Sequence, residues 1–565
     1  AVQYEFFRDR TFVYHGYQHE ACLVDIDAEP PHKINQDALE IALKVAYILK
    51  MQVPSIIRIM RKVVADGSAP SGFQRTSVVG LGVSCSKLET SKGPVGMMSM
   101  NLEEDSCKIE KRAGNKVYYS LSRLGIPLIE LGTMPDIKDP EHAKEVALRI
   151  GRIFRSFPGV KRGIGTIRQD VNVSIGGGSR VEVKGWQDLY KLPLLIENEV
   201  ERQVMLLNFK KKLIDKKVTF RDKPIECTDI FKDSKSRVIS ISIGSKGVVY
   251  GLVLRGLAGF LKEKISGPKH FGAELADYAK AYGVKGMIHT DEDLSKYGLE
   301  QEFGVLCKKV RSKPDDLVLV IAGPKSTVVK AINAVHGRAK ILLKGVPEET
   351  RVPNHVDATS SYARPLPGGA RMYPETDEVD IVIDSKMLSA FQKSVPELLE
   401  DKEKRYVSEF GLSEQIARTL VDSGYCLLFE KMVSKYGKKY AKKVANFFVN
   451  DLSDLRSREK IDTGKLPDSL FIDVFGCYVA GKIVYGAVFV IIKEYVKCSE
   501  SVATIIRDKG LKCLSRSDAE KVVCNIVATK KLLSSGAIMG IVMKELKGKV
   551  DGVVISELVR KHCKK

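Results

Sequence analysis

Hydrophobic and polar residues alternate most regularly along residues 165–185, GTIRQDVNVSIGGGSRVEVKG. Valines and an isoleucine fill every second position on both sides of a glycine triplet at 176–178. Strand side chains alternate between two faces, so we predict an antiparallel hairpin that turns at these glycines. One of its faces is apolar, and the other carries Arg168, Asp170, Asn172, Ser174, Arg180, Glu182 and Lys184.

Two interpretations of this polar face stay open. Many sheets bury one face and expose the other to water, and alternation alone predicts no more than that. A mixture of Asp, Asn and Arg is nevertheless more typical of the floor of a ligand site than of a solvated strand.

Helical periodicity is clearest in two segments of the first half. Residues 35–50 predict a buried helix capped by Asn35, and residues 139–157 predict one with Asp139 as N-cap and Pro140 in its first turn. The hydrophobic pattern of residues 236–256 predicts strands. Residues 346–385 are rich in Pro and Gly, which predicts irregular chain. After residue 386 the pattern is helical and rich in lysine.

Charge and length add two expectations. A chain of 565 residues is too long for a single hydrophobic core, so several domains are expected. The net charge of +21 favours a polyanionic partner, although charge that only keeps the protein in solution is the alternative. No apolar run is long enough for a bilayer, and the eleven cysteines contain no CxxC pair. We therefore expect a cytoplasmic protein without a membrane segment.

Two acidic positions follow apolar strands. Glu104 lies in LEEDSC (102–107), and Glu130 ends the run IPLIE. Such carboxylates need a partner, so we expect Glu104 and Glu130 to bind a hard cation or, alternatively, to form salt bridges with nearby arginines. Gln74 and Arg75 in DGSAPSGFQRT (66–76) could wrap an anionic ligand, or belong to a plain surface loop.

Taken together, several stretches resemble the family of the E subunit of archaeal glutamyl-tRNA(Gln) amidotransferase and, more distantly, the bacterial B subunit. They are MRKVVADGSAPSGFQRT, LEEDSCKIE, SRLGIPLIELGTMPDI, VKRGIGTIRQDVNVSIGGGSRVEVKGWQDL, EVERQ, GVPEETR and YARPLPGGARMYPETD. The stretch FGAELADYAKAYGVKGMIHTDE is similar to an insert that the archaeal E subunit shares with bacterial aspartyl-tRNA synthetases.

The resemblance implies an α+β multidomain fold with a mixed-sheet cradle. Residues 1–228 would form its first part, 229–345 an inserted synthetase-like α+β domain, and 346–385 the return to the cradle. Residues 386–455 would form a helical domain, and 456–565 a tail that binds tRNA.

The resemblance also implies a reaction. Glu carried by tRNA(Gln) is phosphorylated by ATP with Mg²⁺ and then amidated with ammonia from an asparaginase-like glutaminase subunit, in a heterotetramer of two plus two subunits. The resemblance makes Glu104 and Glu130 the expected metal ligands. From the types of residue on the hairpin face and beside it, we further expect Gln74, Arg75 and Arg180 to contact the nucleotide, and we expect the catalytic residues to be Arg168, Asp170, Asn172, Glu182 and Lys184.

The sequence departs from the family at its start. The family opens with a strand motif, Gly-x-Glu-x-His, that contributes to the metal site, and no match occurs here. One alternative is therefore a non-catalytic tRNA-binding homologue that has lost this motif. A relative of aspartyl-tRNA synthetase is another, and it rests on the insert alone.

Overall fold

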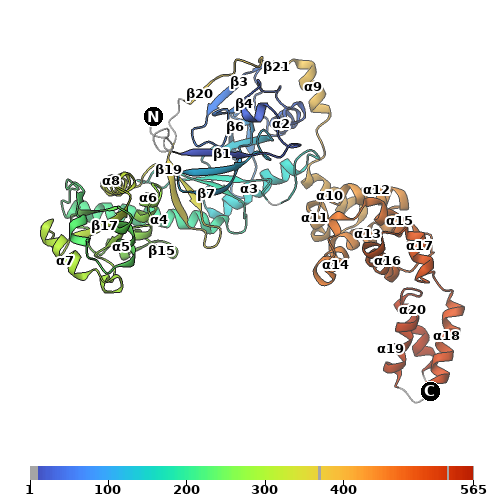
Figure 1. Cartoon of the computed structure of the whole chain (residues 1–565). Helices are drawn as coiled ribbons and strands as arrows, with labels where there is room; N and C mark the ends of the chain where they lie inside the picture. Colours follow the sequence, from blue (N-terminus) through green and yellow to red (C-terminus); the bar gives the residue numbers. More distant parts are fainter. Residues whose placement is uncertain (1–9, 164, 367–370, 531–533, 564–565) are drawn as a thin grey trace. The chain divides into compact units, whose positions relative to one another are not determined.

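The computed structural model describes residues 10–163, 165–366, 371–530 and 534–563. The chain divides into two compact units, Ala1–Pro396 and Glu397–Lys565, and each is treated by itself (Figure 1). The first mixes sheets and helices, and the second is helical. The predicted class, a multidomain α+β protein followed by a helical region, is confirmed at this level.

A six-stranded sheet forms the largest β layer of the first unit. The strand order is β20-β3-β4-β6-β5, and β9 also pairs with β6. Helices α2 and α3 both contribute to the core of this region, with Leu39, Leu43 and Val146 in one cluster with Met100 and Leu102. The elements are β3 (Ile59–Val63), β4 (Phe73–Leu81), β5 (Lys87–Leu88), β6 (Val95–Glu104), β9 (Pro127–Thr133), β20 (Met372–Pro374), α2 (Gln36–Ile48) and α3 (Pro140–Arg155).

Both helices predicted in this region are confirmed, together with their caps. The Asn35 side chain accepts a hydrogen bond from the backbone N–H of Ala38, and Asp139 does the same for His142. Each cap satisfies one of the N–H groups that a helix leaves without an internal partner.

A four-stranded sheet, in the order β10-β11-β18-β19, contains the predicted hairpin. Its antiparallel arms are β10 (Gln169–Val173) and β11 (Val181–Trp186), and Gly177 in the turn has φ of +75°. Beside them run β18 (Glu349–Pro353), parallel to β11, and β19 (Ser360–Pro365). Helix α4 (Leu192–Asp215) packs against β10.

The described residues of 346–385 contain four strands, contrary to the irregular chain expected from the sequence. Each of the strands β18, β19, β20 and β21 (Ile381–Val382) is short, and three of them pair with strands from earlier in the chain. Such pairing depends on distant partners, so Pro and Gly in the segment itself conceal it.

A separate sheet, in the order β12-β13-β17-β16, lies within residues 225–323. The strand prediction for 236–256 is half wrong: β13 (Val248–Leu254) is a strand, but Arg237–Gly244 forms helix α5. Ile239 and Ile243 pack in one cluster while Ile241 is exposed, which is a helical and not an alternating pattern. The remaining elements here are β12 (Ile225–Glu226), β14 (Lys264–Ser266), β15 (Lys269–His270), α6 (Phe271–Lys280), β16 (Ile288–His289), α7 (Glu300–Lys309), β17 (Leu317–Gly323) and α8 (Lys325–Leu342).

Smaller elements complete the first unit. A three-stranded sheet joins β1, β8 and β7, and β2 pairs with β21. Their bounds, with those of the last helix of this unit, are β1 (Thr11–His15), β2 (Ile56–Ile57), β7 (Lys108–Ala113), β8 (Lys116–Ser120) and α9 (Ser385–Lys393).

The second unit contains two hydrophobic clusters. The larger runs from Leu399 to Leu511, and the smaller runs from Ala519 to Val559. The expected boundary between residues 455 and 456 falls inside the larger cluster, so the helices do not separate there. These helices are α10 (Leu399–Phe410), α11 (Glu414–Asp422), α12 (Cys426–Tyr436), α13 (Ala441–Asn446), α14 (Leu452–Glu459), α15 (Asp468–Val479), α16 (Tyr485–Cys498), α17 (Val502–Asp508), α18 (Arg516–Thr529), α19 (Ser535–Glu545) and α20 (Gly552–His562).

A helix that spans a membrane must be both long and apolar. Within the described ranges, no helix combines the length and the apolar character that crossing a bilayer requires.

Candidate active site

A row of polar residues crosses the four-stranded sheet on one face. Asn172 of β10 lies opposite Glu182 of β11, Glu182 opposite Thr350 of β18, and Thr350 opposite Arg364 of β19. Residues in register share a face, so the four side chains form one line. The Thr350 hydroxyl donates a hydrogen bond of 3.0 Å to Glu182. The predicted polar face therefore exists and extends beyond the hairpin.

Three charged residues of the hairpin interact directly. Lys184 Nζ lies 2.9 Å from Asp170 and 3.2 Å from Glu182. Burial disfavours the ammonium of Lys184, but the two carboxylates more than offset that cost, and the pKa of Lys184 is raised. Lys184 therefore keeps its positive charge on this face.

The two hairpin arginines differ in their surroundings. Arg168 contacts Asp105 at 3.4 Å, and Asp105 also pairs with Arg123 at 3.1 Å. Arg180 is exposed, and its side chain has no hydrogen bond or ion pair with another described residue. The guanidinium of Arg180 is therefore available to an anionic ligand.

A second polar face belongs to the six-stranded sheet. Lys62, Gln74 and Thr76 lie on it, because the register pairs Lys62 with Gln74 and Thr76 with Glu103. Glu103 accepts a hydrogen bond of 2.8 Å from Lys62 and one of 3.2 Å from Thr76.

Asn101 and Glu130 continue this face. They are register partners on β6 and β9, and the Asn101 amide donates to Glu130 at 3.2 Å. Asn101 and Glu103 are two residues apart on β6, so Glu103 and Glu130 are diagonal neighbours with Cα atoms about 7–8 Å apart.

Glu104 and Arg75 lie on the opposite face of the same sheet, which corrects the predicted geometry. Glu104 is one position beyond Glu103, and a shift by one residue moves a side chain to the other face. There Arg75 is buried and forms ion pairs with Glu104 and Glu378. Glu104 and Glu130 thus do not converge, and the salt-bridge alternative holds for Glu104. Gln74 meets Glu104 only at the backbone, where the Gln74 amide donates to the carbonyl oxygen.

Arg371 follows β19 in the chain, and its backbone oxygen accepts a hydrogen bond from the N–H of Val63, next to Lys62. Burial lowers the pKa of Arg371 most, and the neighbouring Arg364 lowers it further, while Glu103, Glu182 and Asp66 raise it. Arg371 thus lies within electrostatic reach of a carboxylate from each sheet. Its side chain has no hydrogen bond or ion pair with another described residue, although Arg364 lies 3.8 Å from Asp66.

Sequence reasoning missed Lys62, Glu103, Arg364 and Arg371 as parts of this site. Glu103 stands next to Glu104 in LEEDSC, and only the strand register separates their faces. The two arginines lie in the Pro- and Gly-rich segment, whose content of charged residues is unlike that of a plain linker.

The donor set on the second face fits a hydrated divalent cation. Glu103, Glu130 and Asn101 supply oxygen atoms, and Mg²⁺ commonly binds one or two carboxylates while it keeps several waters. The described part of the chain contains no group of three or more His, Cys, Asp or Glu residues arranged for a metal, so water or substrate must complete the shell.

Comparison with known proteins gives a consistent result. The family model of the GatB/GatE catalytic domain matches residues 8–389, and the model of the GatB domain matches residues 427–563. Three relatives, each named as the E subunit of glutamyl-tRNA(Gln) amidotransferase, come from Methanocaldococcus jannaschii, Thermococcus gammatolerans and Methanococcus vannielii, at 41%, 39% and 38% identity. Each alignment covers 99% of this chain and 89% of the relative. The chain therefore belongs to the GatB/GatE family.

Proposed function

We propose that this chain is the subunit of a tRNA-dependent amidotransferase that phosphorylates the Glu carried by tRNA(Gln) and converts it to Gln. In a member of this family, the observation that carries the proposal is the pair of polar faces: the row from Asn172 to Arg364 on one sheet, and the contacts of Glu103 with Lys62 and of Glu130 with Asn101 on the other. Two carboxylate-bearing faces, together with Arg180 and Arg371, which form no ion pair with another described residue, suit a reaction between ATP and a carboxylate.

The first step brings two anions together, so charge neutralisation and positioning are what the protein must supply. Arg371, Arg180 and Lys184 would neutralise the phosphates from the side of the hairpin, and Lys62 would do so from the other sheet. Glu103 and Glu130, bridged by Asn101, would hold Mg²⁺. When bound, the ion would supply Lewis-acid stabilisation of the charge on the phosphates.

The second step replaces the phosphate with ammonia, delivered by an asparaginase-like partner subunit. Glu182 and Asp170 are acceptors on the hairpin face, so they would orient the incoming ammonium and take up its proton, while Asn172 would orient the substrate. The proposal includes a heterotetramer of two plus two subunits.

The tRNA contact is assigned to the second unit. Residues 515–565 contain more Lys and Arg than Asp and Glu, and they form the smaller cluster of that unit. Such a surface suits the phosphate backbone of an RNA more than its base edges.

Amidation by the purified chain tests the proposal. With ATP, Mg²⁺, free ammonium and Glu-tRNA(Gln), we expect Gln-tRNA(Gln) and ADP in equal amounts, and neither product without ATP. Binding of the tRNA without amidation would instead support the non-catalytic homologue. ATP–pyrophosphate exchange that depends on Asp would support the synthetase relative, and we expect none.

A further inference from the structure

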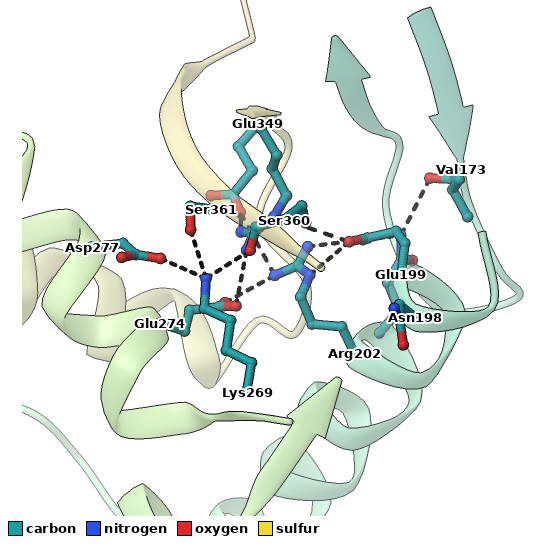
Figure 2. Close-up of polar contacts among 12 residues, drawn as sticks. Val173, Asn198, Glu199, Arg202, Lys269, Glu274, Asp277, Glu349, Ser360 and Ser361 are labelled. Carbon is teal, nitrogen blue, oxygen red and sulfur yellow. Dashed lines mark hydrogen bonds and ion pairs between the residues drawn. The ribbon is translucent and has the colours of Figure 1, made fainter. Parts of the chain in front are cut away.

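A fully buried network of charges lies behind the hairpin. Arg202 of α4 donates to Glu199 at 2.8 and 2.9 Å and to Glu274 of α6 at 2.8 Å (Figure 2). Arg338 of α8 and Arg351 of β18 also donate to Glu274, at 2.9 and 3.2 Å. All five side chains are at most 2% exposed, so none of these charges can exchange its partner for water.

Strand β18 carries this network on one face and the polar row on the other. Glu349 and Arg351 form an ion pair with each other inside the network, and Arg351 Nε also donates to Ser360 at 2.7 Å. Thr350, between them, points to the opposite face and donates to Glu182. Two neighbours of Thr350 are thus fixed while its own hydroxyl reaches the candidate site.

A second contact joins the network to the hairpin. Gln203 is buried, and its amide donates to Glu199 at 3.0 Å and to the backbone oxygen of Val173 at 3.2 Å. Val173 follows Asn172, the register partner of Glu182. The hairpin is therefore held at both arms by groups that belong to the network.

We propose that Thr350 is a positioning residue, which fixes the Glu182 carboxylate toward Lys184 and passes the rigidity of the buried network to the reacting groups. This inference rests on the proposed function, since it gives Glu182 its role there. The hydroxyl is the only group of Thr350 that the role requires, because Glu182 Oε2 accepts from it while Oε1 lies 3.2 Å from Lys184.

The test compares Thr350→Val, which keeps the shape and loses the hydroxyl, with Thr350→Ser, which keeps the hydroxyl. Thr359→Val is the matched control, because Thr359 is also buried and its hydroxyl donates to Asp357 at 2.8 Å, away from the polar row. The measurements are kcat and KM for Glu-tRNA(Gln) in the amidation assay, the melting temperature, and the crystal structure of each variant.

We expect Thr350→Val to lower kcat about tenfold, the effect of one hydrogen bond to a charged group, with KM for tRNA within about twofold. Thr350→Ser restores kcat, and Thr359→Val leaves it unchanged. Equal losses in Thr350→Val and Thr359→Val, or a change in melting temperature alone, would overturn the positioning role. If the wild-type chain gives no amidation, the proposed function fails, and the crystal structures decide this inference: a Glu182 carboxylate in the same place in Thr350→Val contradicts it.

Discussion

The two faces of the four-stranded sheet carry the same kinds of charged residue, but those on one face are fully buried and those on the other are partly exposed. Behind the sheet, Arg202, Arg338 and Arg351 are buried beside Glu199, Glu274 and Glu349. In front, Lys184, Asp170 and Glu182 are partly exposed, and Arg180 lacks an ion pair with any described residue. Charge content alone therefore does not separate a structural network from a functional face.

The two sets of charges differ in their burial and in how completely they are paired. Buried charges are tolerated only when paired, and Arg338 even places its guanidinium over the rings of Phe271 and Tyr278 at 5.7 and 5.6 Å. Burial lowers the pKa of Arg371 most and repulsion from Arg364 lowers it further, so an anionic ligand that contacts Arg371 would offset that repulsion. Partly exposed charge on a rigid frame, with arginines such as Arg180 that form no ion pair with another described residue, is what we take as the mark of the site.

The sharpest comparison is between adjacent residues on opposite faces of the larger sheet. Glu103→Gln should lower amidation by about 10³-fold, as expected for loss of a group that stabilises charge in the transition state. Binding of tRNA should not change, because the proposed tRNA contact belongs to the second unit. Steady-state amidation and a filter-binding assay measure the two effects.

Glu104→Gln is the matched control for that experiment. In this variant Arg75 keeps its ion pair with Glu378 but loses the one with Glu104. We expect the loss of one partner by a buried donor to lower the free energy of unfolding by about 1–3 kcal/mol and to leave amidation unchanged. If Glu104→Gln abolishes amidation and Glu103→Gln does not, Glu104 is the metal ligand and the register argument is wrong.

Substitutions in the buried network behind the sheet should lower the free energy of unfolding. Glu274 accepts from three arginines, and Glu274→Gln leaves the buried Arg338 without a carboxylate partner among the described residues, so it should cost about 3–5 kcal/mol. Urea unfolding of the full chain measures this change. A loss below about 1 kcal/mol, typical of a surface pair, would show that the network is not the rigid frame inferred above.

The same variant should change the dependence of stability on pH. Burial raises the pKa of Glu274, but Arg202, Arg351 and Arg338 more than offset it, and the folded-state pKa is well below its ordinary 4.5. The stabilisation is therefore complete above pH 4.5 and is lost as pH falls further. The difference in unfolding free energy between wild type and Glu274→Gln should narrow below pH 4.5, and a constant difference would contradict the pairing.

Arg371→Gln should lower kcat/KM for ATP about 10- to 100-fold. The proposed contact of Arg371 with the phosphates is a hydrogen bond to a charged group, and such a bond contributes roughly 1.5–3 kcal/mol. Arg58→Gln is the control, because Arg58 forms an exposed pair with Asp380 at 3.1 Å. Equal effects of the two substitutions on ATP kinetics would remove Arg371 from the site.

The smallest expected effect concerns tRNA. Deletion of 515–565 removes the smaller cluster of the second unit and leaves the larger one intact. We expect KM for tRNA to rise about tenfold, which corresponds to about 1.4 kcal/mol, and its salt dependence to become flatter. An unchanged salt dependence would assign this cluster another role.

Local signals in the sequence predict what depends on local structure. Asn35 and Asp139 can be recognised as caps because capping needs only neighbouring residues, and the hairpin at 165–185 follows from alternation and its glycine turn. Three strands within 346–385, namely β18, β20 and β21, escape such reasoning because their partners are more than a hundred residues away along the chain.

The candidate site is predictable in part for the same reason. The alternation in the hairpin reveals its polar face, but LEED does not reveal which of two glutamates shares a face with Glu130. Only the pairing of Asn101 with Glu130 fixes that choice.

A crystal structure of the chain with Mg²⁺ and a non-hydrolysable ATP analogue tests the central claim most directly. The account predicts an ion between Glu103 and Glu130, with phosphate oxygens within hydrogen-bonding distance of Arg371. A nucleotide bound on the opposite side of the sheet, beside Glu104 and Arg75, would contradict it.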